Sequence, residues 1–136
     1  MIMEKVDNIA DKEVVNIESS KSTPAILLDR PNGTIKMEGR SLPENPKTYY
    51  ESVKRWLSVY AENPENETNV TFDLDYFNTA SGKVIMEIID ILKTIDEKGK
   101  EIKIEWRYQE DDEDTLEAGE DFAELTGLEM NFISYP

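Results

Sequence analysis

Polar side chains suited to phosphate chemistry lie in a short stretch between two apolar segments. Asn78, Thr79 and Ser81 follow an alternating pattern that ends at Leu74 and precede an apolar stretch that begins at Val84. A hydroxyl can accept a phosphoryl group, and the free amides at a helix start favour a nearby anion. The same residue types also cap helices, which stabilises a helix by about 1 kcal/mol. Spacing alone leaves both roles open, and capping is the simpler one.

The residues that flank this stretch add two further observations. Tyr76 and Phe77 precede it, and aromatic side chains in a loop often form a contact surface, although they also pack into cores. Ser81-Gly82-Lys83 is similar to the end of a nucleotide-binding phosphate loop, but position 77 is Phe where that loop needs Gly, and position 84 is Val where it needs Ser or Thr. The nucleotide-binding interpretation therefore fails.

Carboxylates are the other residues that could do chemistry. The run Glu110 to Asp114 invites a calcium interpretation, but calcium loops place ligands at alternating positions with a Gly in mid-loop, and here the first Gly is Gly119. A solvated loop that favours the start of a following helix is the better interpretation, and an acidic docking patch for a basic partner is compatible with it. Asp73 and Asp75 could share a proton if buried, but such pairs more often lie on an exposed rim.

Composition excludes many functions. The chain has 136 residues with 15 Lys and Arg against 30 Asp and Glu, so its net charge is −15. This charge disfavours binding to nucleic acid or to anionic membranes. The absence of Cys and His excludes disulfides, thiol nucleophiles, imidazole zinc sites and histidine-based catalysis. We expect no catalytic residues, no metal and no cofactor.

The elements that position these residues follow from apolar periodicity. Two strands at 25–28 and 35–37, joined by the turn sequence Arg-Pro-Asn-Gly at 30–33, predict a β-hairpin, with a weaker strand near 14–17. After a loop at 39–46, a helix over about 46–61 is predicted. Its apolar face consists of Tyr49, Val53, Trp56, Leu57 and Tyr60.

Strands and helices then alternate. After a polar loop at 63–69, a strand at 70–74, a loop through 76–82 and a helix with its apolar stripe over 84–95 are predicted, followed by a strand at 102–108. Asp114 and Glu117 are a candidate capping pair for a third helix that ends near Gly127, with Ala118, Phe122 and Leu125 on one face. The last residues, 130–135, form a short extended piece. The fold class is α/β, a mixed central sheet with helices packed against it.

The chain is expected to hold a flexible leader at residues 1–13 and a single domain at 14–136. No apolar run reads as a signal peptide or approaches the roughly 20 residues of a membrane span, so a cytoplasmic location is expected.

Several short segments together resemble known families. Asn-Thr-Ala-Ser-Gly at 78–82 between a strand and an apolar helix, with Ala-Glu-Leu-Thr-Gly-Leu at 123–128, resembles STAS domains, the fold of anti-sigma-factor antagonists. The chain is more similar still to the SiaC-like family of bacterial regulatory phosphoproteins. The matching segments are Ser-Thr-Pro at 22–24, Gly-Arg-Ser-Leu-Pro-Glu-Asn at 39–45, Tyr-Phe-Asn-Thr at 76–79, Trp-Arg-Tyr at 106–108, Asp-Glu-Asp at 112–114 and Glu-Ala-Gly-Glu-Asp-Phe at 117–122.

This resemblance implies a STAS-like, non-enzymatic regulator that switches partners. Family members are phosphorylated by a cognate Ser/Thr kinase on the Thr of the Asn-Thr pair and reset by a PP2C-like phosphatase. Unmodified, they bind and activate a diguanylate cyclase, which raises cyclic di-GMP and favours biofilm. The phosphorylation site carries over to Thr79. Family members commonly have further hydroxyls after this Thr, whereas this chain has Ala80 and then Ser81, which leaves Ser81 as a minor candidate.

The implied partner-binding residues are Tyr76, Phe77, Asn78, Thr79, Ser81 and Lys83. Two alternatives stay open from the sequence. One is an anti-sigma-factor antagonist that binds a kinase or anti-sigma factor. The other is a small acidic protein that binds a metal or ligand.

Overall fold

The computed structural model describes residues 9–136 as one α/β unit. In chain order the elements are η1 (Ile9–Asp11), β1 (Val14–Ile17), β2 (Ala25–Asp29), β3 (Thr34–Ser41), α2 (Pro46–Tyr49), α3 (Glu51–Glu62), β4 (Glu67–Phe77), α4 (Thr79–Glu97), β5 (Glu101–Gln109), α5 (Glu113–Thr126) and β6 (Asn131–Tyr135). Among these residues, none of the helices combines the length and the apolar character needed to cross a bilayer.

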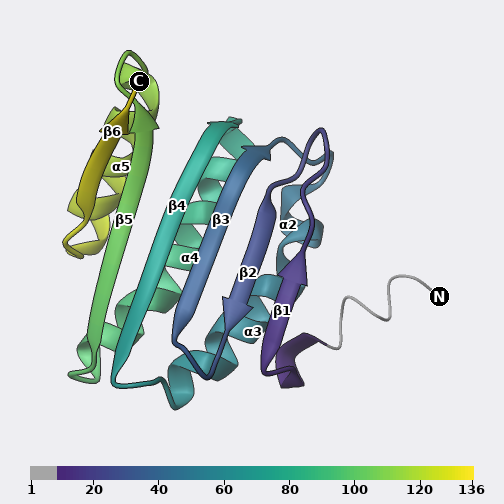
Figure 1. Cartoon of the computed structure of the whole chain (residues 1–136), viewed down its shortest axis with the longest axis vertical. Helices are drawn as coiled ribbons and strands as arrows, with labels where there is room; N and C mark the ends of the chain where they lie inside the picture. Colours follow the sequence, from purple (N-terminus) through teal and green to yellow (C-terminus); the bar gives the residue numbers. More distant parts are fainter. Residues whose placement is uncertain (1–8) are drawn as a thin grey trace.

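The six strands form one mixed sheet in which spatial order follows chain order, β1 to β6. The first three strands pair antiparallel, and β3, β4, β5 and β6 run parallel. Because each parallel strand is added beside the preceding one, right-handed crossovers carry every connecting helix over the same face. Figure 1 shows the helices on one side of the sheet and an uncovered face on the other. The expected mixed sheet with packed helices is confirmed.

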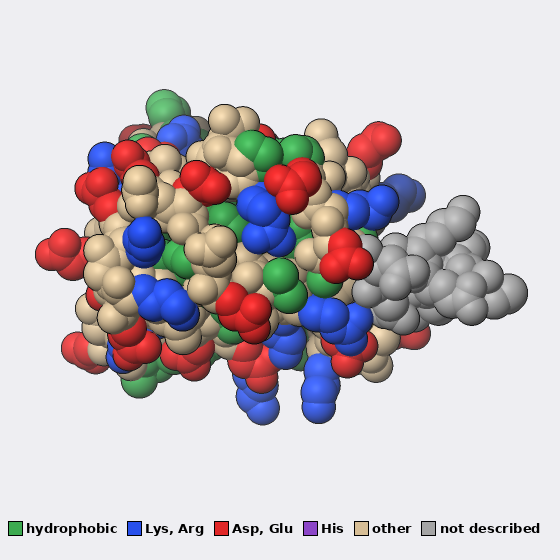
Figure 2. All heavy atoms as spheres, turned by 90° about the horizontal axis from the view of Figure 1, so that it is seen from below, with side chains coloured by type: hydrophobic (Ala, Val, Ile, Leu, Met, Phe, Trp, Pro, Cys, Tyr) green, Lys and Arg blue, Asp and Glu red, His purple; other side chains and the backbone are tan. Residues whose placement is uncertain are grey.

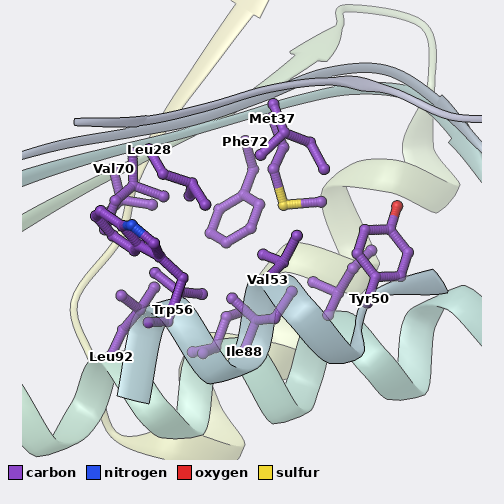
Figure 3. Packing of buried hydrophobic residues seen from close by; sticks show 14 of the residues in the cluster. Leu28, Met37, Tyr50, Val53, Trp56, Val70, Phe72, Ile88 and Leu92 are labelled. Carbon is purple, nitrogen blue, oxygen red and sulfur yellow. The ribbon is translucent and has the colours of Figure 1, made fainter. Parts of the chain in front are cut away.

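The core lies between the sheet and the helices. In Figure 3, Trp56 of α3 and Ile88 of α4 point toward Leu28 and Phe72 of the strands. Trp56 is fully buried, as its helical spacing predicts, and its indole N–H donates to the carbonyl of Lys12 at 2.9 Å. The apolar stripe of α4 is likewise buried from Val84 to Ile95. The helical spacing of apolar residues in the sequence therefore predicted the core faces of these helices correctly.

The amino-terminal boundary differs from the expectation. The expected flexible leader includes residues 9–13, but η1 contacts α3 and Ile9 is buried in the core. The Trp56 hydrogen bond to Lys12 fixes the same segment. The rest of the expected leader, residues 1–8, lies outside the described residues.

Two helix boundaries also differ. The helix expected over 46–61 is two helices, because the backbone leaves the helical path at Tyr50, whose side chain is fully buried. The amino-terminal cap of α5 is Asp112 rather than Asp114: its carboxylate accepts from the backbone N–H of Thr115 at 3.1 Å. Leu125, expected on the same face of this helix as Ala118 and Phe122, is instead 70% exposed.

Two segments that were expected to be loops belong to strands. β4 begins at Glu67 and continues to Phe77, so it takes in the ends of the loops expected at 63–69 and 76–82. β3 likewise continues through Gly39 to Ser41, beside the end of β4. These extensions bring β3 and β4 to the start of α4, where the candidate site lies.

Candidate functional site

A bulge at the end of β4 decides which way its two aromatic residues point. Gly39 of β3 pairs with Leu74, but the next residue, Arg40, pairs with Tyr76, so one residue of β4 is skipped. An extra residue reverses the alternation of side chains that follow it. Tyr76 is consequently half exposed, with 51% of its surface accessible.

Phe77 turns inward as a result of the same bulge. Its ring lies 6.2 Å from Trp106 and 6.4 Å from Phe122, between centroids. We expected both aromatic residues to belong to a partner-binding surface. Phe77 instead joins the aromatic packing under that surface, and Tyr76 alone is presented to solvent.

The start of α4 presents Thr79 to solvent. Asn78 is the amino-terminal cap, and its side-chain oxygen accepts from the backbone N–H of Ser81 at 2.9 Å. Thr79 is the first residue of the helix, and both it and Ala80 are exposed. The capping role that competes with phosphate chemistry is therefore filled by Asn78, which leaves the hydroxyl of Thr79 free of that task.

Ser81 has a structural role instead. It is fully buried, and its hydroxyl accepts a hydrogen bond from Ser41 at 3.0 Å. Ser41 is in turn 2.6 Å from the hydroxyl of Tyr50. A kinase or a partner cannot reach Ser81 in this structure, so the expectation of Ser81 as a minor phosphorylation site and as a contact residue does not fit the fold.

The acidic run approaches Thr79 from another helix. A hollow of about 300 Å³ opens between the starts of α4 and α5. Its lining consists of Tyr76, Phe77, Asn78, Thr79, Asp112, Asp114, Thr115 and Ala118. Two carboxylates of the run thus share a cavity with the candidate phosphorylation site, which spacing along the chain did not indicate.

Lys83 lies one turn further along α4 and is exposed. It borders a second hollow, of about 250 Å³, between α4 and α2. Lys47 of α2 borders the same hollow, and Ala80 and Val84 contribute its apolar lining. The hollow beside Ala80 is therefore lined by charges of both signs, Lys47 and Lys83 with Glu87, whereas the charged residues of the hollow beside Thr79 are both carboxylates.

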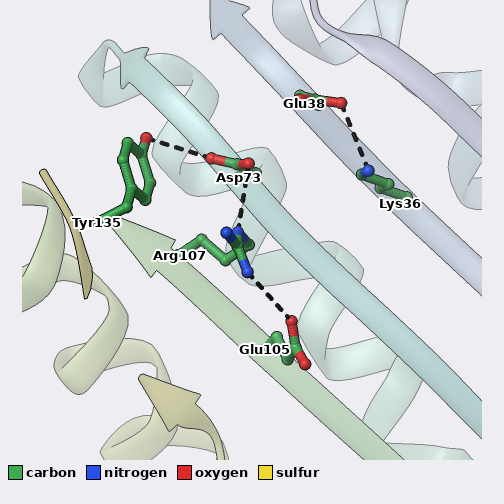
Figure 4. A network of polar contacts seen from close by, with 6 residues as sticks. All are labelled: Lys36, Glu38, Asp73, Glu105, Arg107 and Tyr135. Carbon is green, nitrogen blue, oxygen red and sulfur yellow. Dashed lines mark hydrogen bonds and ion pairs between the residues drawn. The ribbon is translucent and has the colours of Figure 1, made fainter. Parts of the chain in front are cut away.

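The carboxylates of β4 do not form an acid–base pair. Asp73 lies 3.5 Å from the guanidinium of Arg107 and accepts from the hydroxyl of Tyr135 at 3.3 Å, on the uncovered face of the sheet (Figure 4). Asp75 falls at the bulge and is exposed. Burial, followed by the nearby charges of Asp73 and Asp75, raises the pKa of Tyr135 to about 12. Within residues 9–136, no group of three or more carboxylates is arranged to hold a metal ion.

The end of the sheet that carries the candidate site differs in charge from the opposite end. Figure 2, seen from the end that carries the amino ends of β3, β4 and β5, shows Lys and Arg side chains interspersed with Asp and Glu. In contrast, nine acidic residues and a single Arg occur between Glu105 and Asp121, which includes the first half of α5. The surface of α5 is therefore the most acidic part of the candidate site.

Comparison with known proteins identifies the family. A model described as SiaC family regulatory phosphoprotein matches residues 17–135, nearly the whole chain. The chain belongs to the SiaC family. An uncharacterized protein of Pseudomonas aeruginosa is 31% identical over 110 residues, which span 81% of this chain and 87% of that protein.

Solved structures of SiaC have the same fold. Apo-SiaC from Pseudomonas aeruginosa is 27% identical, with a TM-score of 0.78 over 89% of this chain and 98% of that one. A crystal structure of the diguanylate cyclase SiaD in complex with its activator SiaC, also from Pseudomonas aeruginosa, matches with 28% identity and a TM-score of 0.82, covering 89% of this chain and 99% of the matched chain.

The segments that carry the SiaC resemblance come together in the fold. Ser41 from 39–45, Thr79 from 76–79, Trp106 from 106–108 and Asp112 from 112–114 all lie at the end of the sheet where α4 and α5 begin. Sequence reasoning missed Ser41, Asp112 and Asp114 as site residues. The segments that match the SiaC family include all three residues, so the resemblance could have indicated them as site residues.

Proposed function

We propose that this protein is a partner-switching regulator that binds and activates a diguanylate cyclase while Thr79 is unmodified. Phosphorylation of Thr79 by a cognate Ser/Thr kinase releases the cyclase, and a PP2C-like phosphatase restores the active form. The exposure of Thr79 at the start of α4, next to a buried Ser81, carries the proposal. The likeness to SiaC, which is found in complex with the cyclase SiaD, supports the choice of target.

The chemistry of the switch is a phosphoryl transfer to the Thr79 hydroxyl. The kinase moves the γ-phosphoryl group of ATP to Oγ1, so that a new P–O bond forms, ADP leaves and the hydroxyl proton is released. Hydrolysis by the phosphatase returns the hydroxyl and inorganic phosphate. The protein itself acts by binding, and the cyclase carries out the synthesis of cyclic di-GMP, which favours biofilm.

The added phosphate should act on binding and not on folding. It brings a charge of about −1.5 to −2. At the amino terminus of α4 this charge is stabilised by roughly 0.3–1 kcal/mol, so the fold survives modification. At a contact surface the same charge must be desolvated or repelled, and each 1.4 kcal/mol of lost binding energy is a tenfold loss of affinity.

The surface that the proposal assigns to the cyclase is the exposed part of the site: Tyr76, Thr79, Ala80 and Lys83. Asn78 supports this surface as the cap of α4, while Phe77 and Ser81 support it from below. A cyclase that contacts these residues covers the Thr79 hydroxyl, which makes binding and phosphorylation mutually exclusive.

The test is to phosphorylate the protein with the host kinase and to measure cyclase binding and activity for each product. Wild type should gain one phosphate by intact mass and lose cyclase affinity by tenfold or more, while Thr79→Ala should stay unmodified and bind constitutively. Thr79→Glu, which has less charge and no phosphate geometry, should bind weakly. Thr94→Ala, which removes an exposed Thr from the same helix, is the matched control and should behave as wild type.

Equal phosphorylation of wild type and Thr79→Ala would falsify the site. Unchanged cyclase affinity after complete modification of wild type would refute the mechanism. Binding of a kinase or anti-sigma factor in place of any cyclase would favour the anti-sigma-factor antagonist.

A further inference from the structure

The sheet opens beside Thr79. β4 and β5 are paired from Glu67 and Glu101 up to Phe72 and Trp106, and the register ends there. β4 nevertheless continues for five residues to Phe77, and β5 continues to Gln109. Figure 1 shows the two strands diverging toward the end where α4 begins. Beyond Trp106, therefore, no ladder of backbone hydrogen bonds holds the β5–α5 side to the β4–α4 side.

Side chains bridge this opening on both faces of the sheet. On the uncovered face, Arg107 and Tyr135 both contact Asp73 of β4 (Figure 4). On the helix face, the ring of Phe77 packs edge-on against Trp106. These contacts tie the two sides together through a few polar and aromatic pairs rather than through the backbone.

The first turn of α5 is anchored to β5 through the same tryptophan. The indole N–H of Trp106 donates to the carbonyl of Thr115 at 2.9 Å, and Gly119 is so close to the ring that a Cβ there would lie 2.6 Å from the indole nitrogen. Asp112 holds the other side of that turn, because its carboxylate accepts from both the backbone N–H and the hydroxyl of Thr115. A displacement of the Asp112 carboxylate therefore also displaces Thr115, whose carbonyl accepts the hydrogen bond from the Trp106 indole.

A phosphate on Thr79 would exert a force on the Asp112 carboxylate. Thr79 and the two carboxylates of Asp112 and Asp114 line one hollow of about 300 Å³. A dianion there shares a small hollow with two like charges, and like charges in one hollow repel. Lys83, four residues after Thr79 on α4 and at the border of the hollow between α4 and α2, attracts the phosphate toward α2. Both effects favour separation of the phosphate from α5.

We propose that Asp112 and Asp114 are the internal sensor of Thr79 phosphorylation, converting the added charge into displacement of the first turn of α5 and weakening of the Trp106–Thr115 bond. This inference rests on the proposed phosphorylation of Thr79. It adds that the switch changes the shape of the α4–α5 surface as well as its charge. A partner that reads the α5 face then responds to phosphorylation without touching Thr79.

The experiment uses protein in which phosphothreonine is incorporated at position 79 during translation, so no kinase is needed. The two indole N–H groups are the probes, because Trp106 donates to Thr115 and Trp56 donates to Lys12 in a remote part of the core. Hydrogen exchange of both indoles is measured by NMR. We expect phosphorylation to speed exchange at Trp106 by on the order of tenfold and to leave Trp56 unchanged.

A double variant, Asp112→Asn with Asp114→Asn, removes the sensor charges while Asn retains the capping oxygen. In this variant phosphorylation should no longer affect Trp106. The phosphate should also titrate at a lower second pKa than in wild type, as followed by ³¹P NMR, because two neighbouring negative charges have gone. The matched control is Asp111→Asn with Glu113→Gln, which removes two exposed carboxylates that do not line the hollow and should leave both effects intact.

Equal exchange of the Trp106 indole with and without phosphate would overturn the proposal. So would a phosphate pKa that is the same in the sensor variant and in wild type, and so would acceleration at both tryptophans, which would indicate general destabilisation. Failure of the host kinase to modify Thr79 would refute the proposed function, but it would not alter these results.

Discussion

Ser41 donates a buried hydrogen bond to Ser81 across 3.0 Å, which joins the end of β3 to the first turn of α4. The hydroxyl of Tyr50 lies 2.6 Å from Ser41 on its other side, so the short break between α2 and α3 is linked to the same point. The end of β3 and the break between α2 and α3 therefore both meet the first turn of α4, about 40 residues further along the chain than Ser41. This arrangement ties the start of α4 to β3 and to the break between α2 and α3, next to the residue that we propose to be phosphorylated.

Ser81→Ala should destabilise the fold without affecting phosphorylation. It removes one buried hydrogen bond, whose net contribution is about 0.5–1.5 kcal/mol, and leaves Ser41 with a single partner. Urea unfolding should show this loss, while intact mass after kinase treatment should match wild type. Ser58→Ala, at an exposed position of α3, is the control and should unfold as wild type. A Ser81→Ala protein that takes up no phosphate would reassign the modified residue.

Two glycines in helices should respond oppositely to alanine. At Gly119 a Cβ would lie 2.6 Å from the indole nitrogen of Trp106, so Gly119→Ala should force α5 away from β5 and cost about 1–3 kcal/mol. At Gly82 a Cβ would meet Phe77 at an ordinary 3.5 Å, so Gly82→Ala should be neutral or stabilise α4 by up to about 1 kcal/mol. Thermal unfolding of both variants, side by side, tests this contrast. A Gly119→Ala protein as stable as wild type would mean that α5 does not depend on its contact with Trp106.

The regular elements followed from the sequence because local patterns determine them. The apolar stripe of α4 and the turn between β2 and β3 needed only helical spacing and turn residues. The direction of Tyr76 and Phe77 did not follow, because a shift of one residue exchanges the two faces of a strand. Only the pairing of Arg40 with Tyr76 across the bulge settles it.

The composition of the site was harder to predict than the elements that carry it. Asp112 reaches the hollow at Thr79 from 33 residues further along the chain, through the packing of α5 on Trp106. Ser41 reaches Ser81 through the parallel pairing of β3 with β4. Both contacts depend on long-range packing, on which the spacing of residues in one segment carries no information.

The acidic surface of α5 predicts that a partner bound there is basic. Neutralising Glu117, Glu120 and Asp121, which are exposed on α5, should slow association at low salt. The difference should shrink near physiological salt, where charges are screened over about 8 Å. The control neutralises Glu62, Asp96 and Glu97, which are exposed at the ends of α3 and α4. The measurement is the association rate with the cyclase at a series of salt concentrations. A rate that does not change with salt would mean that the acidic face serves only solubility.

Tyr50 should make the fold sensitive to alkali. Burial raises its pKa to about 12 from an ordinary value of 10.0; the hydrogen bond with Ser41 opposes this increase and nearby Tyr49 adds to it. Below about pH 10 the tyrosine is protonated in both states, and its contribution to stability is complete. Above that pH the unfolded chain loses the proton first, so the free energy of unfolding falls as pH rises toward about 12, by roughly 2–3 kcal/mol.

Tyr50→Phe removes this titration, so its unfolding free energy should fall less steeply between about pH 10 and about pH 12. The variant also loses the contact with Ser41, so each protein is compared with its own value at about pH 9, where the tyrosine carries its proton in both states. Urea unfolding at closely spaced pH values gives the two slopes. Other tyrosines, including Tyr135, titrate in both proteins and cancel in the difference. Parallel curves would show that Tyr50 ionises in the folded protein as readily as in the unfolded chain, which requires solvent to reach the Ser41–Ser81 hydroxyls.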